Sequence, residues 1–242
     1  MNAVVMKFFA VVLALVGPAP TDTPKELQLQ QANTIVAIGD SITQGGGYLR
    51  DIDAVLAQQY PDLKIPKVIN VGISGQKAED LVKRFDKDVV ERKPAFVTLS
   101  IGINDVWHRL NDPHDEKVLA AYRDNVAKMV DAAQAAGIKV ILLAPTLISE
   151  DPAAEGNKRL LMYIAAEKQI AADKKCQFVD LHAMFLDALK HKPADEKGNW
   201  ITSDGVHMNP RGDAAMAIGV LRALGVPDQK IAASDVPGIR EK

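Results

Sequence analysis

Ser41 follows an apolar, β-branched run, residues 34–38, that predicts a buried strand. Open α/β sheets bind ligands at the carboxyl ends of their strands, so a serine placed there can meet a substrate. A serine hydroxyl becomes a nucleophile only when a neighbouring base takes its proton. Asp204 and His207 stand three residues apart, and a turn or short helix would place both on one face. This combination predicts acyl transfer in which the acid orients the imidazole and the imidazole activates Ser41.

Two further polar segments follow, or end, other predicted strands and offer hydrogen-bond donors for an oxyanion. One contains Gly72, whose missing side chain lets the backbone approach a ligand closely. The other contains Asn104, whose amide donates without adding charge. Taken singly, each residue also suits a plain turn, and Ser41 also suits a helix cap. Asp40 and Asp105 are expected to support these loops rather than to react.

The motifs resemble those of the GDSL-type esterases, also called SGNH hydrolases, over residues 34–224. The matching residues fall in four blocks: Gly39, Asp40 and Ser41; Gly72; Gly102, Asn104 and Asp105; and Asp204 and His207. Ile42 stands where the family has leucine. The resemblance implies ester hydrolysis, often of short acyl groups, and carbohydrate acetyl esters are common substrates of secreted members. It also assigns the oxyanion hole to the N–H groups of Ser41 and Gly72 and to the Asn104 side chain.

The sequence contains five histidines, and His182 is the rival of His207 as the base because it follows the fifth predicted strand. A packed histidine at a strand end is the simpler interpretation of His182. The other three lie in polar loop or helix-end contexts and are expected to be exposed: His108, His114 and His191. His108 is close enough to Asn104 in sequence to line the site.

The rim of the site is expected from segments beside the matching blocks: Trp107, His108, Pro145, Thr146 and Trp200. Aromatic and polar groups at a shallow rim suit a sugar face or a small ester, although the tryptophans could instead pack the loops. The sequence shows no long hydrophobic lid segment, which argues against long-chain lipids. Two alternatives stay open: a lysophospholipase or thioesterase with the same catalytic residues, and a non-enzymatic flavodoxin-like or sugar-binding module. A flavin-binding module would leave Asp204 and His207 without a role.

The composition is that of an ordinary globular protein: 242 residues, 48% of them hydrophobic, with a net charge of −2. This charge predicts no nucleic-acid partner and no stable membrane association, so the expected partner is a small-molecule or saccharide ester. The sequence has no phosphate-binding glycine motif, and no histidine cluster has metal-ligand spacing. Cys176 is the single cysteine, which excludes an internal disulfide and a cysteine-based metal site. We therefore expect no metal and no cofactor.

Strands and helices alternate along the chain, as in a parallel sheet that is covered on both faces. The expected strands are residues 34–38, 67–71, 96–100, 139–144 and 178–181, and the expected helices are residues 49–60, 78–90, 116–136, 157–174, a short one ending at 190, and 212–224. We predict a three-layer α/β/α sandwich with a flavodoxin-like, five-stranded parallel sheet of order 2-1-3-4-5. The first three strands are then neighbours, so Ser41, Gly72 and Asn104 meet at one edge of the sheet.

Residues 1–20 differ from the rest of the chain, because Lys7 precedes the apolar run 8–16 and a segment of glycine, alanine and proline follows. This pattern predicts a secretory signal peptide, and hence a secreted or periplasmic protein. A disordered or anchoring N-terminus is the alternative. The remaining chain is expected to divide into a polar tether, a hydrolase domain and a peripheral C-terminal tail: residues 21–33, 34–226 and 227–242.

Overall fold

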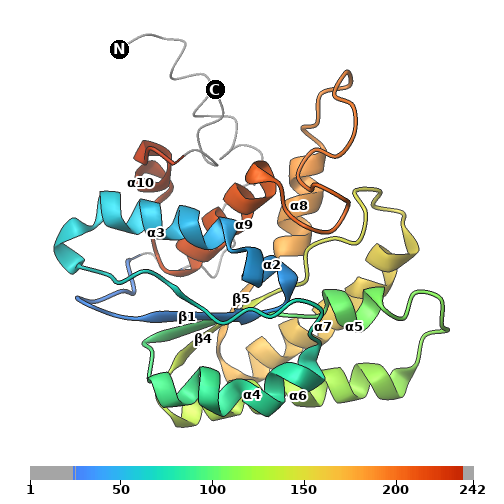
Figure 1. Ribbon diagram of the computed structural model, residues 1–242, viewed down its shortest axis with the longest axis horizontal. Coiled ribbons are helices and arrows are strands. Elements are labelled where there is room, and N and C mark those ends of the chain that lie inside the picture. The colour runs from blue at the N-terminus through green and yellow to red at the C-terminus, as the bar shows by residue number, and fades with distance from the viewer. Residues whose placement is uncertain (1–23, 25, 237–242) are drawn as a thin grey trace.

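The computed structural model describes residues 24 and 26–236, which form a five-stranded parallel sheet between two layers of helices (Figure 1). The strands are β1 (Ile35–Gly39), β2 (Ile69–Asn70), β3 (Phe96–Ser100), β4 (Lys139–Leu143) and β5 (Gln177–Val179). They are ordered β2-β1-β3-β4-β5, and every neighbouring pair is parallel. The predicted fold class and strand order are confirmed, with β1 flanked by β2 and β3.

The central strands carry apolar runs because helices cover both of their faces. All five residues of β1 and of β3 are buried, and Val36 pairs with Val97 across the two strands. At the edge of the sheet, β2 has two residues, whereas the sequence predicts a strand over 67–71. Beyond β2, the Val71 N–H still donates to the Ala37 carbonyl oxygen of β1 at 2.9 Å, whereas before β2 the Val68 N–H donates to Asp53 Oδ1 at 2.8 Å.

Helices of the described chain form a layer on each side of the sheet. They are α2 (Ser41–Gly45), α3 (Gly47–Gln59), α4 (Ala78–Asp88), α5 (Ile103–Trp107), α6 (Glu116–Ala135), α7 (Glu155–Lys174), α8 (Leu181–Leu189), α9 (Pro210–Ala223) and α10 (Asp228–Ala233), with 3₁₀ turns at Pro61–Leu63 and Val90–Arg92. One layer contains α3, α9 and α10, and the other contains α4, α6 and α7 (Figure 1). The long helices lie within two residues of their predicted bounds.

Two short helices, α2 and α5, were not predicted from the sequence. Each begins just after a central strand ends, α2 at Ser41 after β1 and α5 at Ile103 after β3. Both lie at the carboxyl ends of the parallel strands (Figure 1). Five residues are too few to show a hydrophobic period, so the sequence pattern there indicates a loop. Their placement matters because they carry Ser41 and Asn104.

The segments before β1 and after α9 pack on the domain more closely than the sequence predicts. Leu29, in the expected polar tether, is buried. In the expected peripheral tail, α10 contacts α3 and buries Ile231, and Val236 beyond it is also buried. The predicted signal peptide, residues 1–20, lies outside the described residues. Within the described part, no helix is long and apolar enough to cross a membrane.

Candidate active site

The corner between β1 and α2 presents Ser41 at the carboxyl edge of the sheet. Asp40 occupies the N-cap of α2, where its Oδ1 accepts the N–H of Ile42 at 3.0 Å. Gly39 permits this corner, because a Cβ at that position would collide with the Thr43 hydroxyl and with the backbone of β3. Asp40 therefore makes the kind of loop-supporting contact that the sequence predicts, and Ser41 stays partly exposed.

Ser41, His207 and Asp204 form one hydrogen-bonded chain. Ser41 Oγ lies 2.9 Å from His207 Nε2, and His207 Nδ1 lies 2.7 Å from Asp204 Oδ2. Asp204 Oδ1 also accepts the backbone N–H groups of Val206 and His207, at 2.9 and 2.8 Å. The carboxylate thus holds both the imidazole ring and the backbone of His207. The structure brings together the three side chains that the sequence predicts as nucleophile, base and acid.

Asp204 is charged in this arrangement. Burial raises its pKa, but hydrogen bonds from the His207 side chain and from the His207 and Val206 backbone outweigh that effect and lower the pKa to about 2. The Asp204 side chain is 51% exposed and that of His207 is 38% exposed. The His207 ring is therefore held by hydrogen bonds near the surface, beside a carboxylate that stays ionised at neutral pH.

His182, the rival base, is occupied elsewhere in the structure. It lies in the first turn of α8, is buried, and has its Nδ1 2.5 Å from the Thr146 carbonyl oxygen. A ring nitrogen that faces a carbonyl must carry its proton, so Nδ1 of His182 is a donor. The interpretation of His182 as a packed histidine at a strand end is confirmed, and His207 is the histidine that meets the Ser41 hydroxyl.

Gly72 lies directly against the backbone of α2. A Cβ at Gly72 would lie 2.7 Å from the Thr43 carbonyl carbon and 2.8 Å from Thr43 Cβ. The Gly72 N–H donates to Asn70 Oδ1 at 2.9 Å, and Asn70 Nδ2 donates to the Thr43 carbonyl oxygen at 2.7 Å. Asn70 thereby joins the end of β2 to α2. The sequence assigns it no role, because an exposed asparagine at a strand end matches no recognisable pattern.

Asn104 is buried at the start of α5, and its Nδ2 donates to the Gln76 carbonyl oxygen at 3.1 Å. The amide carries a second N–H, which leaves a donor for a ligand. Gly102 before it has a φ of +123°, and a Cβ there would lie 2.6 Å from Pro145 and 2.9 Å from the Tyr122 hydroxyl. Glycine at this position lets β3 turn into α5 and so sets the place of Asn104.

Arg84 of α4 braces the loop that carries Gly72 and connects it to the chain leading to α4. Its guanidinium donates to the Val71 carbonyl oxygen at 2.7 Å and to Gln76 Oε1 at 2.7 Å. It also forms an ion pair with Asp88 at 2.6 Å, one turn further along α4. The sequence pattern does not indicate this supporting role of Arg84, because an arginine on an amphipathic helix usually faces solvent.

Comparisons with known proteins agree on one family. The chain matches the model of the GDSL-like Lipase/Acylhydrolase family over residues 37–215. The chain belongs to this family. An acetylxylan esterase of Geobacillus stearothermophilus is 30% identical over 218 residues, which cover 82% of this GDSL-like chain and 97% of that protein. The lipoprotein YqeF of Bacillus subtilis, which is uncharacterized, is 29% identical over 219 residues, covering 77% of this chain and 87% of that one.

Solved structures agree with this relationship. The crystal structure of the Geobacillus acetylxylan esterase has a TM-score of 0.74 to this chain at 29% identity, covering 84% of this chain and 98% of that one. Three further structures are of catalytic mutants of that enzyme, in which a serine, a histidine or an aspartate is replaced by alanine. The family and these relatives identify the GDSL-like chain as an enzyme that hydrolyses carboxylic esters.

Two buried carboxyl groups lie beneath the site of this GDSL-like esterase. Burial raises the pKa of Asp40 to about 6, although the Ile42 N–H and the nearby His207 oppose the rise. Burial likewise raises the pKa of Asp105 to about 7; the hydrogen bond from the Ala78 N–H opposes this, and the charge of Asp40 adds to it. Asp105 accepts that N–H at 3.3 Å, so it supports the start of α4.

Two of the expected rim residues, Trp107 and His108, are exposed. Trp107 is 39% exposed, and its ring centroid lies 6.3 Å from that of His207 in an edge-to-face arrangement. His108 is also exposed, and its ring centroid lies 6.1 Å from that of Trp107. Ile73, which follows Gly72, is an apolar residue that is 43% exposed. The GDSL-like esterase thus presents apolar groups on the strand-end loops around Ser41.

The other expected rim residues, Pro145, Thr146 and Trp200, are buried. The Trp200 ring is covered by Arg211, whose guanidinium carbon lies 4.0 Å from the ring centroid. Trp200 therefore packs its loop, which is the alternative that the sequence leaves open. The exposed rim is smaller than expected because the loops that carry these three residues fold inward against the domain.

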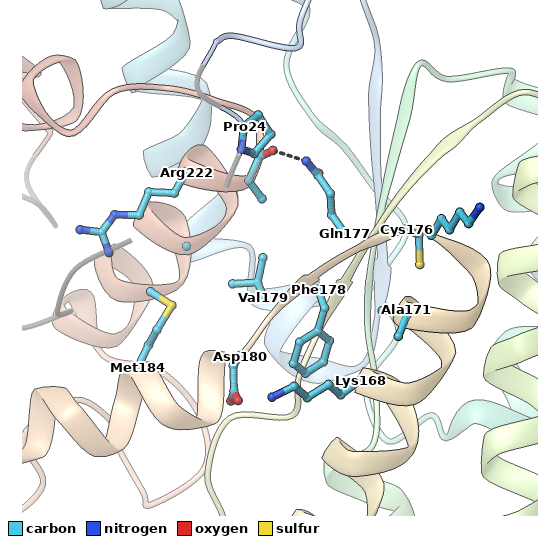
Figure 2. Close-up of a pocket in the computed structure, with 14 residues that line it drawn as sticks. Pro24, Lys168, Ala171, Cys176, Gln177, Phe178, Val179, Asp180, Met184 and Arg222 are labelled. Atoms are coloured by element: carbon cyan, nitrogen blue, oxygen red, sulfur yellow. Dashed lines mark hydrogen bonds between the residues drawn. The ribbon is translucent and has the colours of Figure 1, made fainter. Parts of the chain in front are cut away.

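A cavity of about 560 Å³ lies between α7, β5 and α9 of the GDSL-like esterase (Figure 2). Phe178 of the edge strand β5, Lys168 and Asp180 are among the residues that line it. None of its lining residues belongs to the predicted site, and we assign the cavity no part in ester hydrolysis. Among residues 24 and 26–236, no group of three or more His, Cys, Asp or Glu side chains could hold a metal ion.

Proposed function

We propose that this esterase removes short acyl groups, acetyl foremost, from carbohydrate esters through a covalent intermediate on Ser41. The observation that carries the proposal is the hydrogen-bonded chain from Ser41 Oγ to His207 Nε2, at 2.9 Å, and from His207 Nδ1 to Asp204, at 2.7 Å. A hydroxyl next to an imidazole that a carboxylate orients is an activated nucleophile. The catalytic mutants of the Geobacillus enzyme replace the same three residue types.

In the first step, Ser41 Oγ bonds to the ester carbonyl carbon while its proton passes to His207 Nε2. The carbonyl electron pair moves to oxygen and gives a tetrahedral oxyanion, and Asp204 stabilises the imidazolium. The oxyanion collapses, the bond to the alcohol oxygen breaks, and the alcohol takes the proton from Nε2. Water then repeats the sequence against the acyl group on Ser41, releasing the carboxylic acid and returning the proton to the serine.

The oxyanion would be held by the N–H groups of Ser41 and Gly72 and by Nδ2 of Asn104. These donors come from the ends of β1, β2 and β3, which are adjacent in the sheet. One Asn104 N–H is used by Gln76, which leaves the second for the substrate. The Gly72 N–H is bound to Asn70 Oδ1, so Gly72 must share its proton with the oxyanion as negative charge develops.

The substrate class is inferred from the relatives and from the exposed groups beside the site. The relative at 30% identity is named for acetyl groups on xylan. Trp107, exposed and edge-to-face with His207, offers an aromatic surface on which the apolar face of a sugar ring can rest. A secreted location suits such a substrate, and the signal-like pattern of residues 1–20 together with the lipoprotein relative supports it.

Acetate release from acetylated xylo-oligosaccharides tests the proposal, alongside kcat/KM for p-nitrophenyl acetate, butyrate, octanoate and laurate. We expect kcat/KM to be highest for the acetyl ester and to fall along the series, with Ser41→Ala as the blank. A kcat/KM that rises with acyl length would instead indicate the lysophospholipase or thioesterase alternative. A yellow protein that holds flavin and hydrolyses none of these esters would indicate the binding module.

A further inference from the structure

Glu150, in the loop after β4, binds the segment that leads to Asp204. Its Oε2 accepts the N–H of Trp200 at 2.6 Å. Its Oε1 accepts the N–H groups of Ile201 and Thr202, at 2.8 and 2.7 Å, and the Thr202 hydroxyl at 2.7 Å. One carboxylate therefore takes four hydrogen bonds from three consecutive residues. Because four donors meet the two oxygens of one side chain, this contact holds residues 200–202 in place.

The clamped segment runs directly into a turn, residues 202–208, that carries the proposed acid and base. Thr202 Oγ1, which donates to Glu150, accepts the N–H of Gly205 at 3.1 Å. Thr202 also pairs with Met208 through an antiparallel bridge that closes the turn. Because these bonds share Thr202, and the Gly205 N–H that Thr202 accepts lies between Asp204 and His207, the shape of the turn depends on where Glu150 holds Thr202.

The loop that carries Glu150 is itself held in place. Ser149 adopts a φ of +79°, which is uncommon outside glycine, and its N–H donates to the Gly205 carbonyl oxygen at 2.7 Å. Asn157, buried in α7, accepts the N–H of Ile148 at 2.8 Å and donates to the Ser149 carbonyl oxygen at 2.9 Å. Two adjacent residues of this loop, Ser149 and Glu150, therefore bind the 202–208 turn and the segment before it. Asn157 attaches the same loop to α7.

We propose that Glu150 is a positioning residue that keeps the 202–208 turn in the shape in which Asp204 bonds to His207 and His207 reaches Ser41. This inference rests on the proposed function, because it concerns the same nucleophile and base. Glu150 acts through the backbone of the segment it clamps and not on the substrate. A carboxylate suits this task because it is an acceptor at both oxygens and can serve several N–H and O–H donors at once.

The test compares Glu150→Ala and Glu150→Gln with Glu155→Ala, a matched control that removes an exposed carboxylate from the first turn of α7. We expect Glu150→Ala to lower kcat for p-nitrophenyl acetate about 10- to 100-fold per folded molecule, since misplacement by about 1 Å can cost about 10²-fold. KM should change little. Glu150→Gln keeps an acceptor at the Oε1 position and should retain more activity than Glu150→Ala. The Glu155→Ala variant should retain the wild-type kcat.

Proton NMR gives a readout that a loss of stability alone would not move. The proton between His207 Nδ1 and Asp204 should give a downfield signal, assigned by its loss in His207→Ala. Folded Glu150→Ala, checked by circular dichroism and a melting curve, should lose or shift this signal, and Thr202→Val should shift it less. A wild-type kcat, a change confined to the melting temperature, or a lower kcat with the signal unchanged would each overturn the proposal.

The same measurements separate this inference from the proposed function. If Ser41→Ala hydrolyses esters as fast as the wild type, the proposed nucleophile is wrong. The downfield signal in Glu150→Ala would then still decide whether Glu150 positions Asp204 and His207, because the signal depends on their geometry and not on turnover. An unperturbed signal in that variant overturns the positioning role in either case.

Discussion

The Ser41 hydroxyl oxygen lies 2.9 Å from Nε2 of His207, although 166 residues separate them in the chain. β1 and α2 deliver Ser41, and the turn before α9 delivers His207. The two meet because α9 packs against α3, which follows α2, so the first and last blocks of the domain belong to one helical layer. The distance between Ser41 and His207 is thus set by helix packing as well as by the loops that carry the two residues.

Ser41→Ala should remove ester hydrolysis and leave the fold intact. Alanine cannot form the acyl-enzyme, and loss of a triad serine elsewhere has cost roughly 10⁶-fold in kcat. A fluorophosphonate should label the wild type at Ser41, as mass spectrometry of the digested protein can show, and should not label the variant. An unchanged melting temperature is the control for folding. Labelling of Ser41→Ala, or unchanged hydrolysis, would show that another residue is the nucleophile.

His207→Ala should be about as damaging to kcat as the loss of Ser41, because members of a triad act as a unit. The matched comparison is His182→Ala, since His182 is buried and bonded to the Thr146 carbonyl oxygen. That variant should melt at a lower temperature but keep most of its kcat per folded molecule. Steady-state kinetics and melting curves of both variants check this, and the opposite ranking of kcat would move the base to His182.

Asn104→Ala should lower kcat by about 10²–10³-fold, or roughly 2.7–4 kcal/mol, with KM little changed. The reason is that its free amide N–H gains strength as charge builds on the oxyanion. Asn104 also donates to Gln76, so some loss of thermal stability should accompany the kinetic effect. The control is Asn111→Ala, which changes an exposed asparagine just beyond α5. A large fall in melting temperature with kcat preserved would assign Asn104 a structural role only.

Gly72→Ala should lower both stability and kcat, because the added methyl group would meet the backbone of α2 at under 3 Å. Overpacking of this kind costs about 1–3 kcal/mol and would displace the helix that carries Ser41. Gly45→Ala is the matched control, because Gly45 lies in α2 and a Cβ there would meet nothing within 4 Å. Chemical denaturation and steady-state kinetics check the pair. Equal behaviour of the two variants would contradict the close approach seen at Gly72.

The free energy of unfolding should fall as the pH rises from about 4 to about 7. Burial raises the pKa of Asp40 from 3.8 to about 6 and that of Asp105 from 3.8 to about 7. In this range the folded chain holds protons that the unfolded chain has released, so stability decreases with pH. One pKa unit corresponds to about 1.4 kcal/mol, so the two raised pKa values together correspond to a loss of several kcal/mol.

Urea denaturation at pH 5 and pH 8 measures this slope. Asp105→Asn keeps an oxygen acceptor for the Ala78 N–H but cannot ionise, so the slope should flatten. Asp112→Asn changes an exposed residue in the loop after α5 and should leave the slope as it is. Stability that increases between pH 5 and pH 8 would mean that neither buried carboxyl group stays protonated in the fold.

The amino-acid sequence alone determined the fold class, the strand order and the residues that meet at the strand ends. Apolar runs mark β1, β3 and β4 because strands covered on both faces need hydrophobic side chains throughout. Parallel strands share one carboxyl edge, so the residues that follow them are brought together by topology. The spacing of Asp204 and His207 is equally local, since three residues span one turn and place both side chains on one face.

The tertiary structure alone decided which neighbours hold these residues in place. Asn70, Arg84 and Glu150 bind backbone groups of segments 13 to 52 residues away, and their residue types and sequence contexts look like those of ordinary surface residues. The sequence likewise does not distinguish Trp107, which is exposed, from Trp200, which is buried. Burial and hydrogen-bond partners depend on how separate segments pack, and local sequence patterns record only the period and propensity of each segment by itself.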